Sequence, residues 1–223
     1  ARKYQAEGIL NTDWGDCGHI NQPDFSLPGL IYGAVFSWGE DADSFEKLNE
    51  QISRLAYGDR SGKFVSYMAK TAECSIFDWW DANVVYEEKV LGHPNNRNAL
   101  FDTRIQDEKK RAAVHEILAS LKKELKKTAR EMEESCRYLV STLELTMDAI
   151  DIWNETGARL CDIEYGKEKD EAACAALAGR LEAWFMKYKA SWRSISKEGD
   201  LHHIAEIVFW YADVLRGRRV YGK

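Results

Sequence analysis

Proline is scarce in this chain of 223 residues: it has three prolines, and Pro94 is the only one after residue 42. A long stretch without proline can form uninterrupted helices, because proline lacks the amide hydrogen that a helix interior uses. The sequence also has no run of about 18 apolar residues, which is the length that a membrane-spanning helix needs. We therefore expect long helices beyond residue 42 and no membrane partner.

Basic residues do not outnumber acidic ones, and the formal net charge is −6. Affinity for nucleic acid comes largely from neutralised phosphates, so this charge argues against nucleic acid as the main partner. The glycine-rich nucleotide-binding motifs, GxSxG and CxxC are all missing. The sequence thus predicts no nucleotide or other cofactor and no hydrolase triad.

Cysteine occurs in an odd number and without regular spacing. The chain has five, which are Cys17, Cys74, Cys136, Cys161 and Cys174. Buried free thiols in a reducing compartment explain this pattern better than a disulfide framework does. We therefore predict a cytoplasmic protein.

Apolar residues recur with helical spacing after residue 42, which predicts an antiparallel helical bundle. The expected helices span residues 43–57, 61–91, 169–194 and 200–215, with Gly58 as the stop of the first and Asp200 as the N-cap of the last. Residues 95–102 form the clearest loop. The fold class is mainly α.

A heptad-like apolar stripe lies between these helices. The gap in the stripe contains Thr128 and Glu131, which have the spacing of a capping box. The stripe is therefore either one very long helix or two helices broken near Lys127. Its apolar positions are Val114, Leu118, Leu121, Leu125, Met132, Cys136, Leu139, Leu143, Met147 and Ile150.

Glycine and two of the three prolines gather before residue 42, which suggests a different architecture there. Residues 8–14 have the pattern of a short buried strand that ends in a polar, glycine-rich turn. Residues 28–38 fit either a short helix or a strand, and periodicity does not decide between them.

The segment that follows the expected strand is the richest in chemistry. Asp13, Trp14, Asp16 and His19 fall within eight residues of one another. At the carboxyl end of a barrel strand such groups contact ligands: the indole can stack on a sugar ring and Asp16 can accept from sugar hydroxyls. The alternative is a polar turn in which both aspartates cap backbone amides and Trp14 lies in the core. Cys17 completes a possible set of metal ligands, but the set has no recognisable zinc spacing, so we expect no metal.

A resemblance to a known family covers residues 8–38, which read GILNTDWGDCGHINQPDFSLPGLIYGAVFSW. This run resembles the late part of the catalytic barrel of glycoside hydrolase family 20, the β-N-acetylhexosaminidases and their bacterial relatives. Trp14-Gly15-Asp16 matches the family's Trp-x-acid motif, with aspartate where glutamate is commoner. Residues 27–38 resemble the helix and last strand that close the barrel. Residues 192–216 are similar to the helical region that follows it.

The resemblance implies hydrolysis of terminal N-acetylhexosamine, in which the substrate's acetamido oxygen is the nucleophile and an adjacent Asp-Glu pair assists. The His-x-Gly-x-Asp-Glu motif of that pair is missing from this sequence, so we expect the catalytic half to lie upstream of Ala1. The resemblance makes Trp14 a wall of the sugar pocket and Asp16 an acceptor for sugar hydroxyls. Asp13 and His19 are neighbours with no matched role.

The sequence therefore predicts two parts: residues 1–42 as the end of an incomplete (β/α)8-type barrel, and residues 43–223 as a helical C-terminal domain. The function implied is that of an inactive C-terminal fragment of a glycoside hydrolase, which reaches carbohydrate through the parent enzyme. The alternative is a non-enzymatic helical module in which the apolar stripe is an oligomerisation seam. Exposed barrel elements favour association, so we also predict a homodimer or a rearranged N-terminus. The adjacent Trp79 and Trp80 should place one ring in the core and the other outside.

Overall fold

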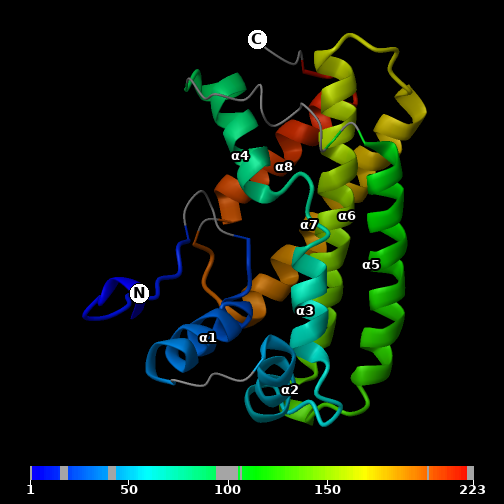
Figure 1. Ribbon diagram of the computed structural model, residues 1–223. Coiled ribbons are helices and arrows are strands. Elements are labelled where there is room, and N and C mark those ends of the chain that lie inside the picture. The colour runs from blue at the N-terminus through cyan, green and yellow to red at the C-terminus, as the bar shows by residue number, and fades with distance from the viewer. Residues whose placement is uncertain are drawn as a thin grey trace.

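The regular secondary structure of the computed structural model is helical. The structure describes residues 2–15, 20–39, 44–93, 105, 107–199 and 201–219. The fold is mainly α, as the sequence predicts (Figure 1). Its eight α-helices within these ranges are α1 (Leu27–Trp38), α2 (Phe45–Ala56), α3 (Phe64–Ala72), α4 (Trp79–Tyr86), α5 (Glu108–Thr128), α6 (Tyr138–Glu164), α7 (Glu171–Ile195) and α8 (Leu201–Leu215). Four short helical turns accompany them: η1 (Arg2–Tyr4), η2 (Pro23–Phe25), η3 (Glu87–Leu91, a π-helix) and η4 (Glu134–Cys136).

Helix α6 is the centre of the bundle. It contacts α4, α5, α7 and α8, and it lies beside α5 along most of its length (Figure 1). Its side chains Leu143, Met147, Trp153 and Leu160 are almost fully buried. None of the helices in the described ranges is long and apolar enough to cross a membrane. Three of the cysteines, Cys74, Cys161 and Cys174, are buried free thiols, as expected, whereas the free thiol of Cys136 is half-buried.

The apolar stripe forms two helices, α5 and α6, rather than one. Its α5 residues Val114, Leu118, Leu121 and Leu125 are all buried. The break falls next to Lys127, but the spacing of Thr128 and Glu131 does not produce a capping box: Thr128 is the last residue of α5, and its carbonyl accepts from the amide of Glu131 in the following turn. The second helix begins only at Tyr138, because a turn and η4 intervene.

A single helix over residues 61–91 is also wrong. The chain leaves α3 after Ala72 and begins α4 at Trp79. Asp78 and Asp81 form a capping box at this start: the Asp78 carboxylate accepts from the Asp81 amide at 2.9 Å, and the Asp81 carboxylate accepts from the Asp78 amide at 3.1 Å. This exchange satisfies amides that the first turn of a helix leaves without partners, and so it favours a new start here.

Asn154 of α6 holds the loop between α3 and α4. Its side chain is 5% exposed; Oδ1 accepts from the amides of Ile76 (2.8 Å) and Phe77 (3.0 Å), and Nδ2 donates to the carbonyl of Cys74 (2.9 Å). One buried side chain thus satisfies three backbone groups that no helix satisfies.

Other boundaries follow the sequence closely. Ser44 caps α2 by accepting from the Lys47 amide, and Gly58 follows this helix with a φ of +59°, which favours glycine. Asp170 caps α7, and its carboxylate accepts from the Ala173 amide at 3.0 Å. Residues 28–38, which fit a helix or a strand, lie in α1. The expected loop at 95–102 and the expected N-cap Asp200 lie outside the described residues.

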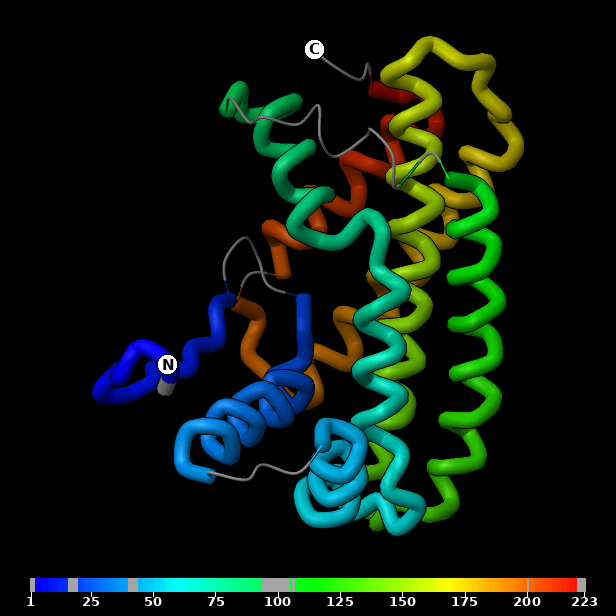
Figure 2. Tube along the Cα trace, viewed as in Figure 1, coloured from blue at the N-terminus to red at the C-terminus, as the bar shows by residue number. Residues whose placement is uncertain are grey.

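The expected strand over residues 8–14 is wrong. This segment is irregular, and its side chains are exposed, Leu10 to 88% and Ile9 to 56%. A strand is stable only when a neighbouring strand takes up its amides and carbonyls, and none runs beside it in the described part of the chain. Residues 2–15 instead lie at the side of the bundle, away from α5 and α6 (Figure 2).

Candidate functional site

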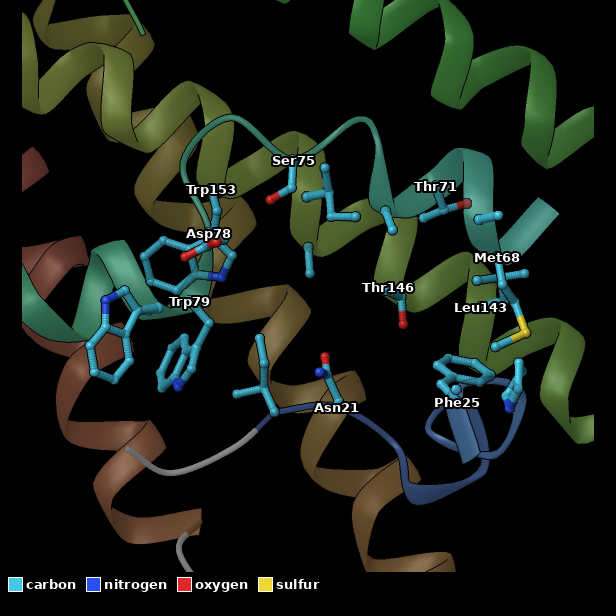
Figure 3. A pocket seen from close by; sticks show the side chains of 18 of the residues that line it. Asn21, Phe25, Met68, Thr71, Ser75, Asp78, Trp79, Leu143, Thr146 and Trp153 are labelled. Carbon is cyan, nitrogen blue, oxygen red and sulfur yellow. The ribbon is translucent and has the colours of Figure 1, made fainter. Parts of the chain in front are cut away.

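A pocket of about 750 Å³ lies between the segment before α1 and the bundle. Its front wall comes from Trp14 and from residues 20–32, and its back wall comes from α3, the α3–α4 loop, the start of α4, and α6 (Figure 3). The two walls thus come from parts of the chain that are distant in sequence. This volume is typical of small-molecule sites.

Aromatic side chains dominate the lining. They come from every wall, and they are Trp14, Phe25, Tyr32, Phe77, Trp79, Trp80 and Trp153. The rings of Trp79 and Trp153 meet edge to face, with centroids 5.6 Å apart and planes at 73°. Such a geometry fixes both rings before any ligand arrives.

Trp153 contributes a buried indole to the back wall of the pocket. The residue is 2% exposed, and its Nε1–H has no acceptor among the described residues. A second edge contact, to Tyr211 at 5.2 Å and 83°, holds the indole in place. A buried N–H without an acceptor costs free energy.

The other polar groups of the pocket are few. Thr71 and Thr146 donate their hydroxyl hydrogens to carbonyls of their own helices, which leaves their oxygens able to accept. Asp78 is the one charged side chain among the described lining residues, and its carboxylate caps α4. No histidine, cysteine, lysine, arginine or glutamate lines the described part of the pocket. The arrangement is therefore suited to binding an uncharged ring-bearing molecule.

Asp24 anchors the front wall to the bundle. The hydroxyl of Tyr57 donates to the Asp24 carbonyl, and the hydroxyl of Tyr138 donates to its carboxylate at 3.1 Å. A third tyrosine, Tyr32, lines the pocket and donates to Asn49 of α2. Burial raises the pKa of both Tyr32 and Tyr57, and for Tyr57 the Asp24 charge adds to this effect. All three tyrosines act here as neutral donors.

Of the predicted site residues, the structure places one at the pocket and one away from it. Trp14 opens onto the pocket; its side chain is 72% exposed, and its Nε1–H donates to the Thr12 hydroxyl at 3.0 Å. The alternative that put this indole in the core is therefore wrong. Asp13 is exposed and does not line the pocket. Asp16 and His19 lie outside the described residues.

Trp79 and Trp80 behave as predicted. Trp79 packs against the core, and Trp80 is 57% exposed. Both residues line the pocket, as Trp14 does.

Sequence reasoning missed Trp153, the buried donor. A signal was present, because Trp153 follows Ile150 at a spacing of three and so continues the apolar stripe. Phe25 and Tyr32 were missed too, and their places in the front wall depend on contacts that local patterns do not encode.

No group of three or more His, Cys, Asp or Glu side chains in the described ranges is arranged to hold a metal ion. Comparison of the chain with protein-family models, with curated proteins and with solved structures gave no match.

Proposed function

We propose that this chain supplies one wall of the sugar-binding site of a glycoside hydrolase that acts on terminal N-acetylhexosamine. In this proposal the acid pair lies in an upstream half of the barrel, and the chain alone binds sugar without hydrolysing it. The observation that supports it is the position of Trp14: the one aromatic residue of the Trp-x-acid motif opens onto an aromatic pocket.

The chemistry of the pocket fits a sugar. A pyranose has an apolar face of C–H groups, which packs on an indole, and a rim of hydroxyls, which need acceptors and donors. Trp14 offers an exposed face, and the hydroxyl oxygens of Thr71 and Thr146 are able to accept from sugar hydroxyls. Asp16 remains the proposed acceptor for sugar hydroxyls, and Asp13 and His19 are its neighbours in the sequence.

The barrel assignment of residues 1–42 is part of the same proposal. The exposed, irregular course of residues 8–14 is what a strand adopts when its neighbours in the sheet are missing. In the intact parent we expect this segment to pair with an adjacent barrel strand, which brings Trp14 to the end of that strand.

Saturation-transfer NMR with methyl N-acetyl-β-glucosaminide tests the proposal on this chain. Trp14→Ala should abolish the signal transferred to the sugar. Trp38→Ala is the matched control, because Trp38 is 89% exposed and does not line the pocket. A chromogenic N-acetylglucosaminide should show no turnover. Equal sugar signals from both variants, or hydrolysis by the chain alone, would refute the proposal.

The second candidate is a non-enzymatic interaction module. The apolar stripe cannot be its seam, because the stripe's α5 residues are buried inside the chain. A different surface favours it: α1 has no charged residue, yet Leu30 is 44% and Phe36 37% exposed. A homodimer through this surface is compatible with either candidate, and sedimentation velocity that shows a monomer at all concentrations would remove it.

A further inference from the structure

One charged side chain lies in the wall of the aromatic pocket. Asp78 is exposed, and it lies just before α4, at the end of the pocket where the rings of Trp79 and Trp153 meet (Figure 3). Every other described lining residue is neutral. A ligand in the pocket therefore meets the charge of a carboxylate that no basic residue of the described lining offsets.

The carboxylate of Asp78 is only partly used as the cap of α4. Its Oδ1 accepts from the Asp81 amide at 2.9 Å, and Oδ2 has no hydrogen-bond donor or basic partner among the described residues. The N-terminus of a helix carries about half a positive charge, which the full negative charge of one carboxylate outweighs. The start of α4 thus presents negative charge to the pocket.

The surroundings of Asp78 strengthen the field of its carboxylate. Most of the described lining is apolar, and low-dielectric walls around charge of one sign focus the field into a cleft. The faces of the aromatic rings carry partial negative charge as well. A sphere with the volume of the pocket is about 11 Å across, and the screening length at about 10 mM salt is about 30 Å. An ionised group anywhere in the pocket therefore experiences this field at low salt.

We propose that Asp78 determines which ligand charge the pocket accepts, so that neutral sugars bind in preference to sugars that carry a carboxylate, sulfate or phosphate group. The inference rests on the proposed function, because it specifies which N-acetylhexosamine derivatives the site takes. Two like charges about 8 Å apart, at an effective dielectric constant of about 40, repel enough to change the affinity roughly fivefold.

Two derivatives of methyl N-acetyl-β-glucosaminide test this inference: the uronic acid, in which a carboxylate replaces the hydroxymethyl group, and the matching uronamide. A carboxylate and a carboxamide have nearly the same size and shape, so at neutral pH the two sugars differ mainly in charge. Competition NMR at about 10 mM salt should show that the wild-type chain binds the uronamide roughly fivefold more tightly. At about 1 M salt, where the screening length is about 3 Å, this preference should fall below about twofold.

A pair of variants assigns the preference to one residue. Asp78→Asn removes the charge and keeps a side chain that caps a helix equally well, and it should reduce the preference at low salt to below about twofold. Asp170→Asn is the matched control: Asp170 caps α7 by accepting from the Ala173 amide at 3.0 Å, and it does not line the pocket. It changes the net charge by the same amount and should keep the full preference. Asp78→Ser, a second neutral cap, replaces Asp78→Asn if that variant does not fold.

Equal affinity of the wild type for the uronic acid and the uronamide would overturn the inference and leave the proposed function standing. Rejection of both derivatives by a chain that binds the parent sugar would do the same, because the exclusion would then not depend on charge. An equal loss of preference in the two variants would also overturn the inference, since the charge of the whole chain would explain it. Failure of the parent sugar to bind would remove the proposed function together with the inference.

Discussion

Replacing Asn154 with alanine should both destabilise the chain and weaken its pocket. Asn154 makes three hydrogen bonds to the α3–α4 loop, to the amides of Ile76 and Phe77 and to the carbonyl of Cys74. Alanine leaves these three buried backbone groups without partners. The loop also forms part of the pocket wall through Ser75 and Phe77.

The structure sets the size of the effect. Each buried hydrogen bond of this kind is worth about 1–1.5 kcal/mol net, so the three together give about 3–4.5 kcal/mol. For a chain of this length 1 kcal/mol shifts the melting temperature by about 2–4 °C, and the expected decrease is roughly 6–18 °C. This is a large share of the roughly 5–15 kcal/mol that stabilises a typical domain.

Urea denaturation followed by circular dichroism measures the free energy, and sugar-binding NMR measures the pocket. Asn11→Ala is the control: Asn11 is exposed, and its side chain makes one hydrogen bond, to the Gly29 carbonyl at 2.9 Å. It should cost less than about 1 kcal/mol. If Asn154→Ala is no more destabilising than Asn11→Ala, the role given to Asn154 is wrong.

Two helical glycines should respond to alanine with opposite signs. In Gly157→Ala the new Cβ would lie 2.5 Å from Phe77 Cγ, which should destabilise by about 1–3 kcal/mol, whereas Gly179→Ala meets nothing within 4 Å and should stabilise by about 0.5–1 kcal/mol. Denaturation midpoints of the same sign would contradict this contrast. The raised pKa of Tyr57, due first to burial and then to Asp24, predicts alkaline sensitivity. An unfolded tyrosine loses its proton near pH 10 and the native one does not, so this stabilisation is complete below about pH 10 and is lost above it. Between pH 9 and 11.5 the urea midpoint should fall less steeply for Tyr57→Phe than for wild type, and parallel curves would refute the assignment.

The helices and their buried faces were predictable from the sequence because they depend on local periodicity. Leu118, Leu121 and Leu125 recur at steps of three and four, which place them on one side of α5, and all three are buried. The caps Ser44 and Asp170 also depend only on neighbouring residues, since each side chain accepts from an amide three residues later. Patterns of this range suffice for a bundle.

Breaks between helices were harder to predict from the sequence, because the same pattern of residues can have two structural outcomes. Asp78 and Asp81 have the spacing of a capping box and form one, whereas Thr128 and Glu131 have it and do not. The difference lies outside each pattern: Asn154, from a helix more than seventy residues away, holds the loop that precedes Asp78. Tertiary contacts of this kind decide where a marginal start is used.

The pocket shows the same limit. The sequence singled out Trp14 and the pair Trp79 and Trp80, which are chemically conspicuous, and the pocket includes all three. It gave no means to bring Trp153 and Tyr32 to the same place, because their positions depend on how α6 and the front-wall segment pack. The strand predicted before Trp14 failed for a related reason: strand formation needs a neighbouring strand, and a single segment cannot indicate whether one is present.

The anchoring of the front wall through Asp24 has a consequence for access to the interior. Residues 20–32 are held to the bundle by a small number of tyrosine hydroxyls and a few partly buried apolar side chains, whereas the opposite wall belongs to α6, the centre of the bundle. Segments that differ in this way open with different free energies, and the weakly tied one separates without unfolding the rest. A molecule can therefore enter and leave by displacing a single short stretch of backbone. The exchange rate of a ligand and the global stability of the protein are then separate properties, which evolution or an engineer can alter one at a time.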